Sequence, residues 1–161
     1  MNETSTGPAP RRQFELGTDG PGAIIVGVDG SEPSLRAAAY AAGLARRQRS
    51  RLVAVYARTQ PAALLTLADH SGVAIKAAID AQDHIEAQLR DAVNSQARTW
   101  DVDARLVVRS GDPLNVLCDV AREVHADAVI VGLSASVAHR IAGSLAVRLV
   151  RCGRWPVTVV P

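Results

Sequence analysis

The sequence predicts an α/β fold built on a doubly wound, five-stranded parallel sheet with strand order 3-2-1-4-5. Short, continuous apolar runs bounded by glycine or polar residues are typical of strands buried on both faces of a sheet. These runs alternate with segments in which apolar residues recur at helical spacing, as expected when helices connect parallel strands. Because such crossovers are right-handed, the doubly wound sheet is the arrangement that we expect, with helices on both faces.

The ordered part of the chain is predicted to begin with a strand, a helix and a second strand. The run AIIVGVD, Ala23–Asp29, is predicted to be the first strand, and RLVAVYAR, Arg51–Arg58, the second. Ser31 is a suitable N-cap for the helix between them, and Pro33 is tolerated in a first helical turn. This helix covers residues 34–48, and its apolar positions at helical spacing are Leu35, Ala38, Ala39, Ala42 and Ala45.

The rest of the chain alternates in the same way after an irregular connection over residues 59–72. A long amphipathic helix is expected over about residues 73–98, with Ala78, Ile85, Leu89 and Ala92 or Val93 on its inner face. The remaining elements are predicted to be a strand over Val102–Val108, a turn at Gly111–Pro113, a helix over residues 113–126, a strand over Asp127–Gly132, a helix from about Gly143 to Cys152 and a strand over Trp155–Val160.

The composition is that of one soluble domain. The chain has 161 residues, of which 48% are hydrophobic and 21% charged. Residues 1–22 are rich in Gly, Pro, Ser and Thr and lack the apolar core of a signal peptide, so we expect a flexible tail followed by a domain over residues 23–161. No apolar run is long enough to span a bilayer, and we expect a cytoplasmic protein with no membrane association.

Several kinds of partner and chemistry are disfavoured. Aromatic residues make up 3% of the chain and the formal charge is +2, which argues against binding to nucleic acid. Cys118 and Cys152 form no CxxC motif and the four histidines are scattered, so we expect neither a disulfide scaffold nor a metal site. The sequence contains neither a P-loop nor a G-x-G-x-x-G motif, and no acidic residue follows Asp127 to complete a serine-hydrolase triad at Ser134.

A ligand crevice is expected where the strand order reverses, beyond the carboxyl ends of the first and fourth strands. Its mouth would be formed by Asp29–Ser31 and by the loop Gly132–Ser144. Asp29 either accepts hydrogen bonds from a ribose hydroxyl or base amine, or orients the first turn of the next helix. Ser144 either helps the free amides at a helix start to hold an anion, or is only the N-cap.

Charge near that loop is positive. The basic residues after Asp127 are His139, Arg140, Arg148, Arg151 and Arg154. They form either a solvated basic helix face or a positive field around a small anion.

Five segments together resemble the universal stress protein family. They are VGVDGS, SEPSLRAAAYAA, GDP, DAVIVG and GSLAVRLVRCGRWPVTVV, and the likeness spans Ala23–Val160. The resemblance implies a Rossmann-like, adenine nucleotide alpha hydrolase-like three-layer sandwich. It also implies a homodimer that pairs through the C-terminal strand, Pro156–Val160, and a stress-response regulator rather than an enzyme. ATP or another adenine nucleotide is the implied cofactor.

The resemblance extends to the nucleotide-binding loop. ATP-binding members carry Gly-x2-Gly-x9-Gly-[Ser/Thr] after the fourth strand. Gly132 matches the first glycine and Gly143-Ser144 the final pair, but Ala135 occupies the middle position and the loop is two residues shorter. A Cβ at this position hinders close approach of the backbone to phosphate, so we expect weakened ATP binding.

The other implied contacts lie at the strand ends and in the loop. Asp29 matches the family's acidic residue near the adenosine, and Val55 and Tyr56 lie at the strand end that flanks the base. Arg140 or His139 would supply positive charge to the phosphates, or would point into solvent. The leading hypothesis is a regulatory homodimer that binds AMP, cyclic AMP or ATP. The alternative is a member that has lost nucleotide binding and acts as an interaction module for an unidentified regulatory protein.

Overall fold

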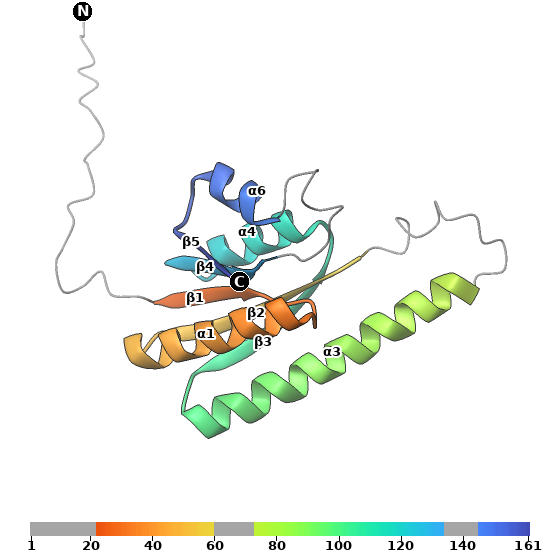
Figure 1. The fold of residues 1–161 in the computed structure, drawn as a ribbon, viewed down its shortest axis with the longest axis horizontal. Coiled ribbons are helices and arrows are strands. Elements are labelled where there is room, and N and C mark those ends of the chain that lie inside the picture. Colours follow the sequence, from red (N-terminus) through yellow and green to blue (C-terminus); the bar gives the residue numbers. More distant parts are fainter. Residues whose placement is uncertain (1–21, 60–72, 134–144) are drawn as a thin grey trace, which may run out of the picture.

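The computed structural model describes residues 22–59, 73–133 and 145–161, and these residues form a five-stranded, all-parallel sheet (Figure 1). The strands are β1 (Ala23–Gly27), β2 (Arg51–Arg58), β3 (Ala104–Ser110), β4 (Ala128–Gly132) and β5 (Val157–Val160). Their order is β3-β2-β1-β4-β5, which confirms the predicted doubly wound sheet. The order reverses between β1 and β4.

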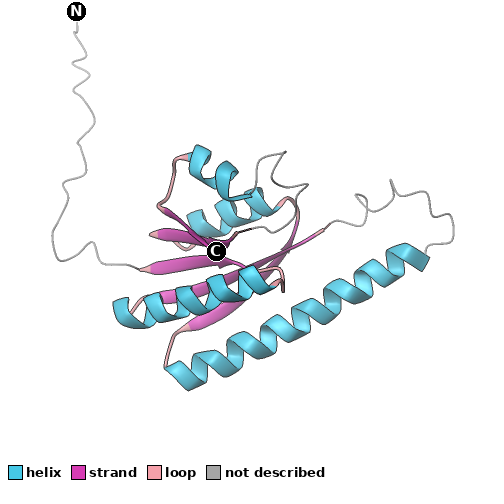
Figure 2. Ribbon diagram, viewed as in Figure 1, coloured by secondary structure: helices cyan, strands magenta, loops and turns pink. Residues whose placement is uncertain are grey.

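Helices cover both faces of the sheet and make a three-layer sandwich (Figure 2). One face is covered by α1 (Glu32–Gln48) and α3 (Val73–Trp100), and the other by α4 (Pro113–Glu123) and α6 (Leu145–Cys152). Alternate residues of β1 supply the two cores: Ile24 and Val26 pack on the α1 side, whereas Ala23 and Ile25 pack on the α4 side. Burial on both faces explains why the strands are continuous apolar runs.

Helix α1 begins as expected, and its buried face is in part the predicted one, since Ala42 and Ala45 are buried. The Ser31 hydroxyl accepts a hydrogen bond from the Ser34 amide at 3.4 Å and caps the helix. The buried positions are Ser34, Ala37, Ala41, Ala42 and Ala45. The expected contact residue Leu35 is 46% exposed. An alanine-rich helix offers similar apolar surface in several directions, so the sequence pattern does not determine which one faces the sheet.

Several strand boundaries also differ from the prediction: β4 begins at Ala128 rather than Asp127, and β5 at Val157 rather than Trp155. Strand β1 ends at Gly27, two residues before Asp29, because the chain turns at Gly30, whose φ is +81°. Strand β3 begins at Ala104 and ends at Ser110, two residues later at each end than predicted. The predicted tail over residues 1–22 lies almost wholly outside the described residues, as does most of the predicted connection over 59–72.

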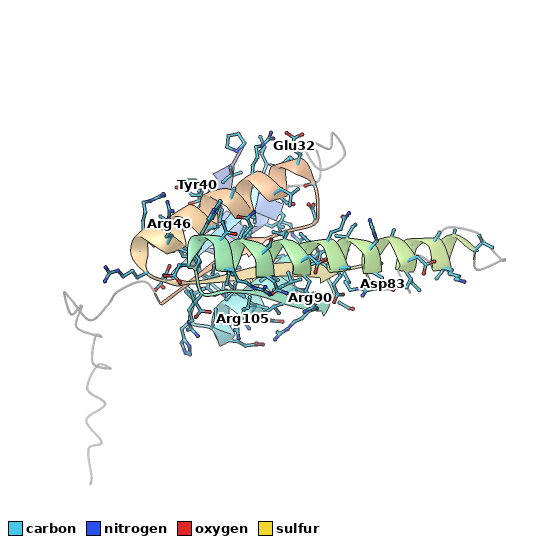
Figure 3. All side chains as sticks on the ribbon, turned by 90° about the horizontal axis from the view of Figure 1, so that it is seen from below. Glu32, Tyr40, Arg46, Asp83, Arg90 and Arg105 are labelled. Atoms are coloured by element: carbon cyan, nitrogen blue, oxygen red, sulfur yellow. The ribbon has the colours of Figure 1, made fainter. Side chains whose placement is uncertain are left out.

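Helix α3 is tied to the sheet by ion pairs and leaves an apolar cavity beneath it. Arg58, at the end of β2, binds Asp83 and Glu86 of α3 at 2.6 and 3.0 Å. Figure 3 shows α3 lying alongside α1, with Asp83 and Arg90 along its length. A cavity of about 230 Å³ lies between these two helices and the sheet. Within residues 22–59, 73–133 and 145–161, none of the helices combines the length and the apolar character of a membrane span.

Candidate functional site

A crevice of about 570 Å³ opens beyond the carboxyl ends of β1 and β4, at the predicted place. Its walls come from the ends of β1, β2 and β4 and from the first turns of α1, α4 and α6. The lining residues on which the site depends are Asp29, Ser31, Val55, Asp112, Gly132 and Arg148. This position follows from the topology, because β1 and β4 continue into helices on opposite faces and leave space between them.

Asp29 lies at the mouth of the crevice and organises the start of α1. Its Oδ1 accepts a hydrogen bond from the Ser31 amide at 2.9 Å, and its own amide donates to Ser34 Oγ at 3.2 Å. Partial burial by itself raises the pKa of Asp29, but hydrogen bonds from Ser31 and Ser34 outweigh it and lower the pKa. The side chain is therefore a carboxylate at neutral pH. A carboxylate has about four lone-pair sites, so the group can also accept a hydrogen bond from a ligand hydroxyl.

Gly132 is positioned where the first turn of α1 crosses the end of β4. A Cβ at this residue would lie 2.5 Å from both the carbonyl carbon and the carbonyl oxygen of Pro33, and 2.8 Å from the Ser34 nitrogen. These are backbone atoms, which a side chain cannot displace without moving the helix. The glycine thus brings α1 and β4 together at one wall of the crevice, in addition to any contact that it makes with phosphate.

Val55 and Tyr56 occupy opposite faces of β2. Val55 is buried and lines the crevice, and its carbonyl oxygen accepts a hydrogen bond from the Val28 amide at 2.9 Å. Tyr56 packs in the core beneath α1 and α3, where burial raises its pKa. Because side chains alternate along a strand, only Val55 of these two residues faces the crevice.

An ion pair that the sequence did not suggest bridges α4 and α6 at the crevice. Asp112 caps α4 by accepting from the Asn115 amide at 3.2 Å. Both of its oxygens also accept from the Arg148 guanidinium, at 3.0 Å each, which makes a bidentate pair. The hydrogen bonds from Arg148 lower the pKa of Asp112, so the pair remains ionised through the neutral range.

The described side chains that line the crevice carry a net charge of about −1, because two carboxylates face one guanidinium. Among the described lining residues, Asp29 and Asp112 are the carboxylates and Arg148 is the one cation. That cation is already bound to Asp112, which limits its attraction for phosphate. No group of three or more His, Cys, Asp or Glu side chains within the described ranges is placed to hold a metal ion.

The structure therefore brings together part of the predicted site. Asp29, Val55 and Gly132 line one crevice, as expected. The other predicted residues, Ala135, Arg140, Gly143 and Ser144, lie outside the described residues. Asp112 and Arg148 were missed as a pair, although the GDP turn and the basic C-terminal helix were both visible in the sequence. Residues 36 positions apart meet only once the strand order brings α4 beside α6.

Comparison with solved structures finds the same fold in universal stress proteins. One from Burkholderia pseudomallei is 28% identical, with a TM-score of 0.65 over 86% of this chain and 95% of that protein. A universal stress protein in complex with cAMP is 24% identical, with a TM-score of 0.61 over 88% and 98%. An Arabidopsis thaliana family protein with AMP bound is 14% identical, with a TM-score of 0.58 over 87% and 91%. At these lower identities, the last two likenesses show the fold alone.

A comparison with curated protein sequences finds no match. The sequence profile of the universal stress protein family, in contrast, matches residues 22–161, which include every described strand and helix. The predicted resemblance is therefore confirmed: this chain belongs to the universal stress protein family.

Proposed function

We propose that this protein is a stress-response regulator that binds an adenine nucleotide in the crevice between β1 and β4 and acts by binding rather than by catalysis. The observation that carries the proposal is the position of Asp29 at the mouth of a crevice large enough for a nucleotide. Family relatives solved with cAMP and with AMP support the choice of ligand class. As a regulator without a membrane helix in its described residues, it is proposed to act in the cytoplasm.

The adenosine half of the ligand is assigned to the β1 and β2 side of the crevice. The Asp29 carboxylate would accept hydrogen bonds from ribose hydroxyls, in addition to the bond from the Ser31 amide. Val55 supplies buried apolar surface at the same end of the sheet, against which a base can pack. Asp29 is suited to this role because its hydrogen bonds to α1 fix its orientation before a ligand arrives.

The phosphate half is assigned to the side of Gly132, Arg148 and the loop through Ser144. Here the structure favours a ligand with little phosphate charge. Arg148 is neutralised by Asp112, and Ala135 replaces the second glycine of the family's loop. The proposed order of affinity is cyclic AMP and AMP ahead of ADP, with ATP weakest.

The functional unit is proposed to be a homodimer that pairs through the C-terminal strand, Pro156–Val160. Strand β5 is the last strand of the sheet and is hydrogen-bonded on one side, by β4, within the described residues. Its other edge is a row of backbone donors and acceptors that a second copy of the strand would satisfy.

Thermal melts and titration calorimetry with cyclic AMP, AMP, ADP and ATP test the nucleotide assignment. A nucleotide at one hundred times its dissociation constant should stabilise the fold by about 2.7 kcal/mol. Asp29→Asn should weaken all four ligands about tenfold, because the amide keeps the bond from Ser31 but loses the charged acceptor. The fold should be unchanged.

A second variant tests the phosphate side. Asp112→Asn retains an N-cap for α4 but releases Arg148, so ATP affinity should rise about three- to tenfold relative to cyclic AMP. Asp119→Asn is the matched control: it removes an exposed ion pair with Arg122 from the same helix, outside the crevice lining, and should leave every affinity unchanged.

If none of the four nucleotides at millimolar concentration shifts the melt, and none copurifies, the nucleotide proposal is wrong. That result would leave the second hypothesis, an interaction module that works through an unidentified regulatory protein. If nucleotides bind but Asp29→Asn has no effect, the ligand class stands and the assignment of Asp29 fails.

A further inference from the structure

The only two cysteines of the chain lie in contact, although they are 34 positions apart in the sequence. Cys118 is on α4 and Cys152 is the last residue of α6, and their sulfur atoms are 3.9 Å apart. Both are free thiols, Cys118 buried and Cys152 half-buried. No third cysteine of the chain can compete for either partner.

The sulfur atoms need a short movement to bond. The sulfurs of a disulfide are about 2.0 Å apart, so the pair must approach by roughly 2 Å. Cys152 ends its helix and is followed by Gly153, whose φ is +64°. The backbone of a residue at a helix end shifts more readily than that of a residue in the middle, because no further helical turn follows it.

The thiols form a second link between helices that already share an ion pair. Asp112 meets Arg148 near the start of the two helices, and Cys118 meets Cys152 farther along both. The helices therefore run side by side in the same direction, with the ion pair at the crevice and the thiols away from it. A bond between the sulfurs would fix α6, which carries Arg148, against α4.

We propose that Cys118 and Cys152 form a modification site for two-electron oxidants of the hydroperoxide class, which convert them into a reversible disulfide that clamps α6 to α4. The inference goes beyond nucleotide binding and does not depend on it.

The chemistry is balanced in two steps. The Cys152 thiolate attacks one peroxide oxygen and breaks the O–O bond; an alcohol or water leaves after protonation, and Cys152 becomes a sulfenic acid. The Cys118 sulfur then attacks the Cys152 sulfur, the S–O bond breaks, and water leaves with the thiol proton. Two thiols are oxidised by two electrons in total, and the peroxide is reduced.

Burial sets the order of these steps. Cys152 is the more accessible sulfur and therefore meets the oxidant first. Burial raises the pKa of the Cys118 thiol, and the adjacent Cys152 raises it further, although Arg154 and Arg122 act in the opposite direction. Cys118 suits the resolving role, since it needs contact with Cys152 rather than with solvent.

Oxidation of the reduced full-length protein by hydrogen peroxide tests the proposal. The intact mass should fall by two hydrogen atoms, both thiols should become unreactive toward maleimide in denaturant, and digestion should release a Cys118–Cys152 linked peptide. The melting temperature should rise by about 5–10 °C, and dithiothreitol should reverse every change. Amide exchange should slow in α6 and α4.

Single-cysteine variants distinguish the disulfide between α4 and α6 from unspecific oxidation of either thiol. Cys118→Ala should accumulate a dimedone-reactive sulfenic acid on Cys152 and show no rise in melting temperature. Cys152→Ala should react far more slowly at the buried thiol. The proposal is overturned if oxidation yields a disulfide between chains, if Cys152 proceeds to a sulfinic acid while Cys118 stays free, or if both thiols survive peroxide that oxidises free cysteine.

Discussion

Gly132 shows how one residue serves the fold and the crevice together. The family's loop pattern indicates a glycine that lets backbone amides approach phosphate, whereas the structure shows a glycine that lets the first turn of α1 cross β4. The missing Cβ leaves the space that the Pro33 backbone occupies, whereas the contact with phosphate stays a prediction. The structural role applies even without a bound ligand, and it can be tested on the folded protein alone.

Gly132→Ala should lower the free energy of unfolding by about 2–3 kcal/mol, because the added methyl group meets the Pro33 backbone. Gly43→Ala is the matched control in α1, where a Cβ meets only the flexible end of Arg47. That control should stabilise the protein by about 0.5–1 kcal/mol. Urea unfolding followed by circular dichroism measures both changes; equal effects of the two substitutions would show that the close approach is not a constraint.

At the scale of elements, α1 and α3 do not pack tightly against each other and the sheet, and an apolar cavity lies between them. Four residues of the α1 face expected to pack on the sheet, Leu35, Ala38, Ala39 and Ala42, line the cavity of about 230 Å³. Alanines on both helices leave this volume because they are too short to meet across it. An unfilled apolar cavity forgoes contacts that larger side chains would make.

Ala97→Leu should fill part of this cavity from α3 and raise the free energy of unfolding by about 1–2 kcal/mol. Ala87→Leu makes the same substitution at an exposed position of the same helix, outside the cavity lining, and should change stability little. Differential scanning calorimetry of the two variants measures the difference. A gain that is the same in both would show that helix propensity, rather than cavity filling, is responsible.

The sequence predicted the elements well because hydrophobic periodicity is a local property. Strands such as β1 and β4 are buried on both faces, so their apolar runs are continuous, and the capping residue Ser31 marks the start of α1. Strand ends were less accurate, since backbone pairing to neighbouring strands decides where β3 begins. The buried face of α1 was partly wrong because alanine gives no directional signal.

The site was predicted in part, because local sequence patterns place some of its residues and not others. Gly132 is the last residue of β4 and Asp29 lies two residues after the end of β1, so the topology alone places them at one sheet edge. The Asp112–Arg148 pair and the Cys118–Cys152 pair each join residues more than thirty positions apart, through the packing of α6 on α4. No local pattern encodes that packing. The C-terminal strand was predicted as an element, but its role in assembly depends on a second copy of the chain.

At the scale of the whole molecule, the exposed edge of β5 determines how the proposed dimer can form. Amides of β4 and of the residue after it donate to Pro156 and Val160, at 3.0 and 2.7 Å. Because successive residues of a strand direct their backbone groups to opposite sides, Thr158 faces β4 as well, whereas Val157 and Val159 present theirs to the open edge. The side chain of Val159 is also 37% exposed.

Val159→Pro should convert the proposed dimer into a folded monomer, because it removes an outward amide and leaves the hydrogen bonds to β4 in place. Thr158→Pro is the contrasting variant: it removes an amide that faces β4 and should destabilise the monomer itself. Light scattering on the eluting peak gives the mass of each species, and circular dichroism reports folding. A wild-type protein of monomeric mass contradicts the dimer, and a Val159→Pro protein that retains the dimeric mass shows that the two copies meet elsewhere.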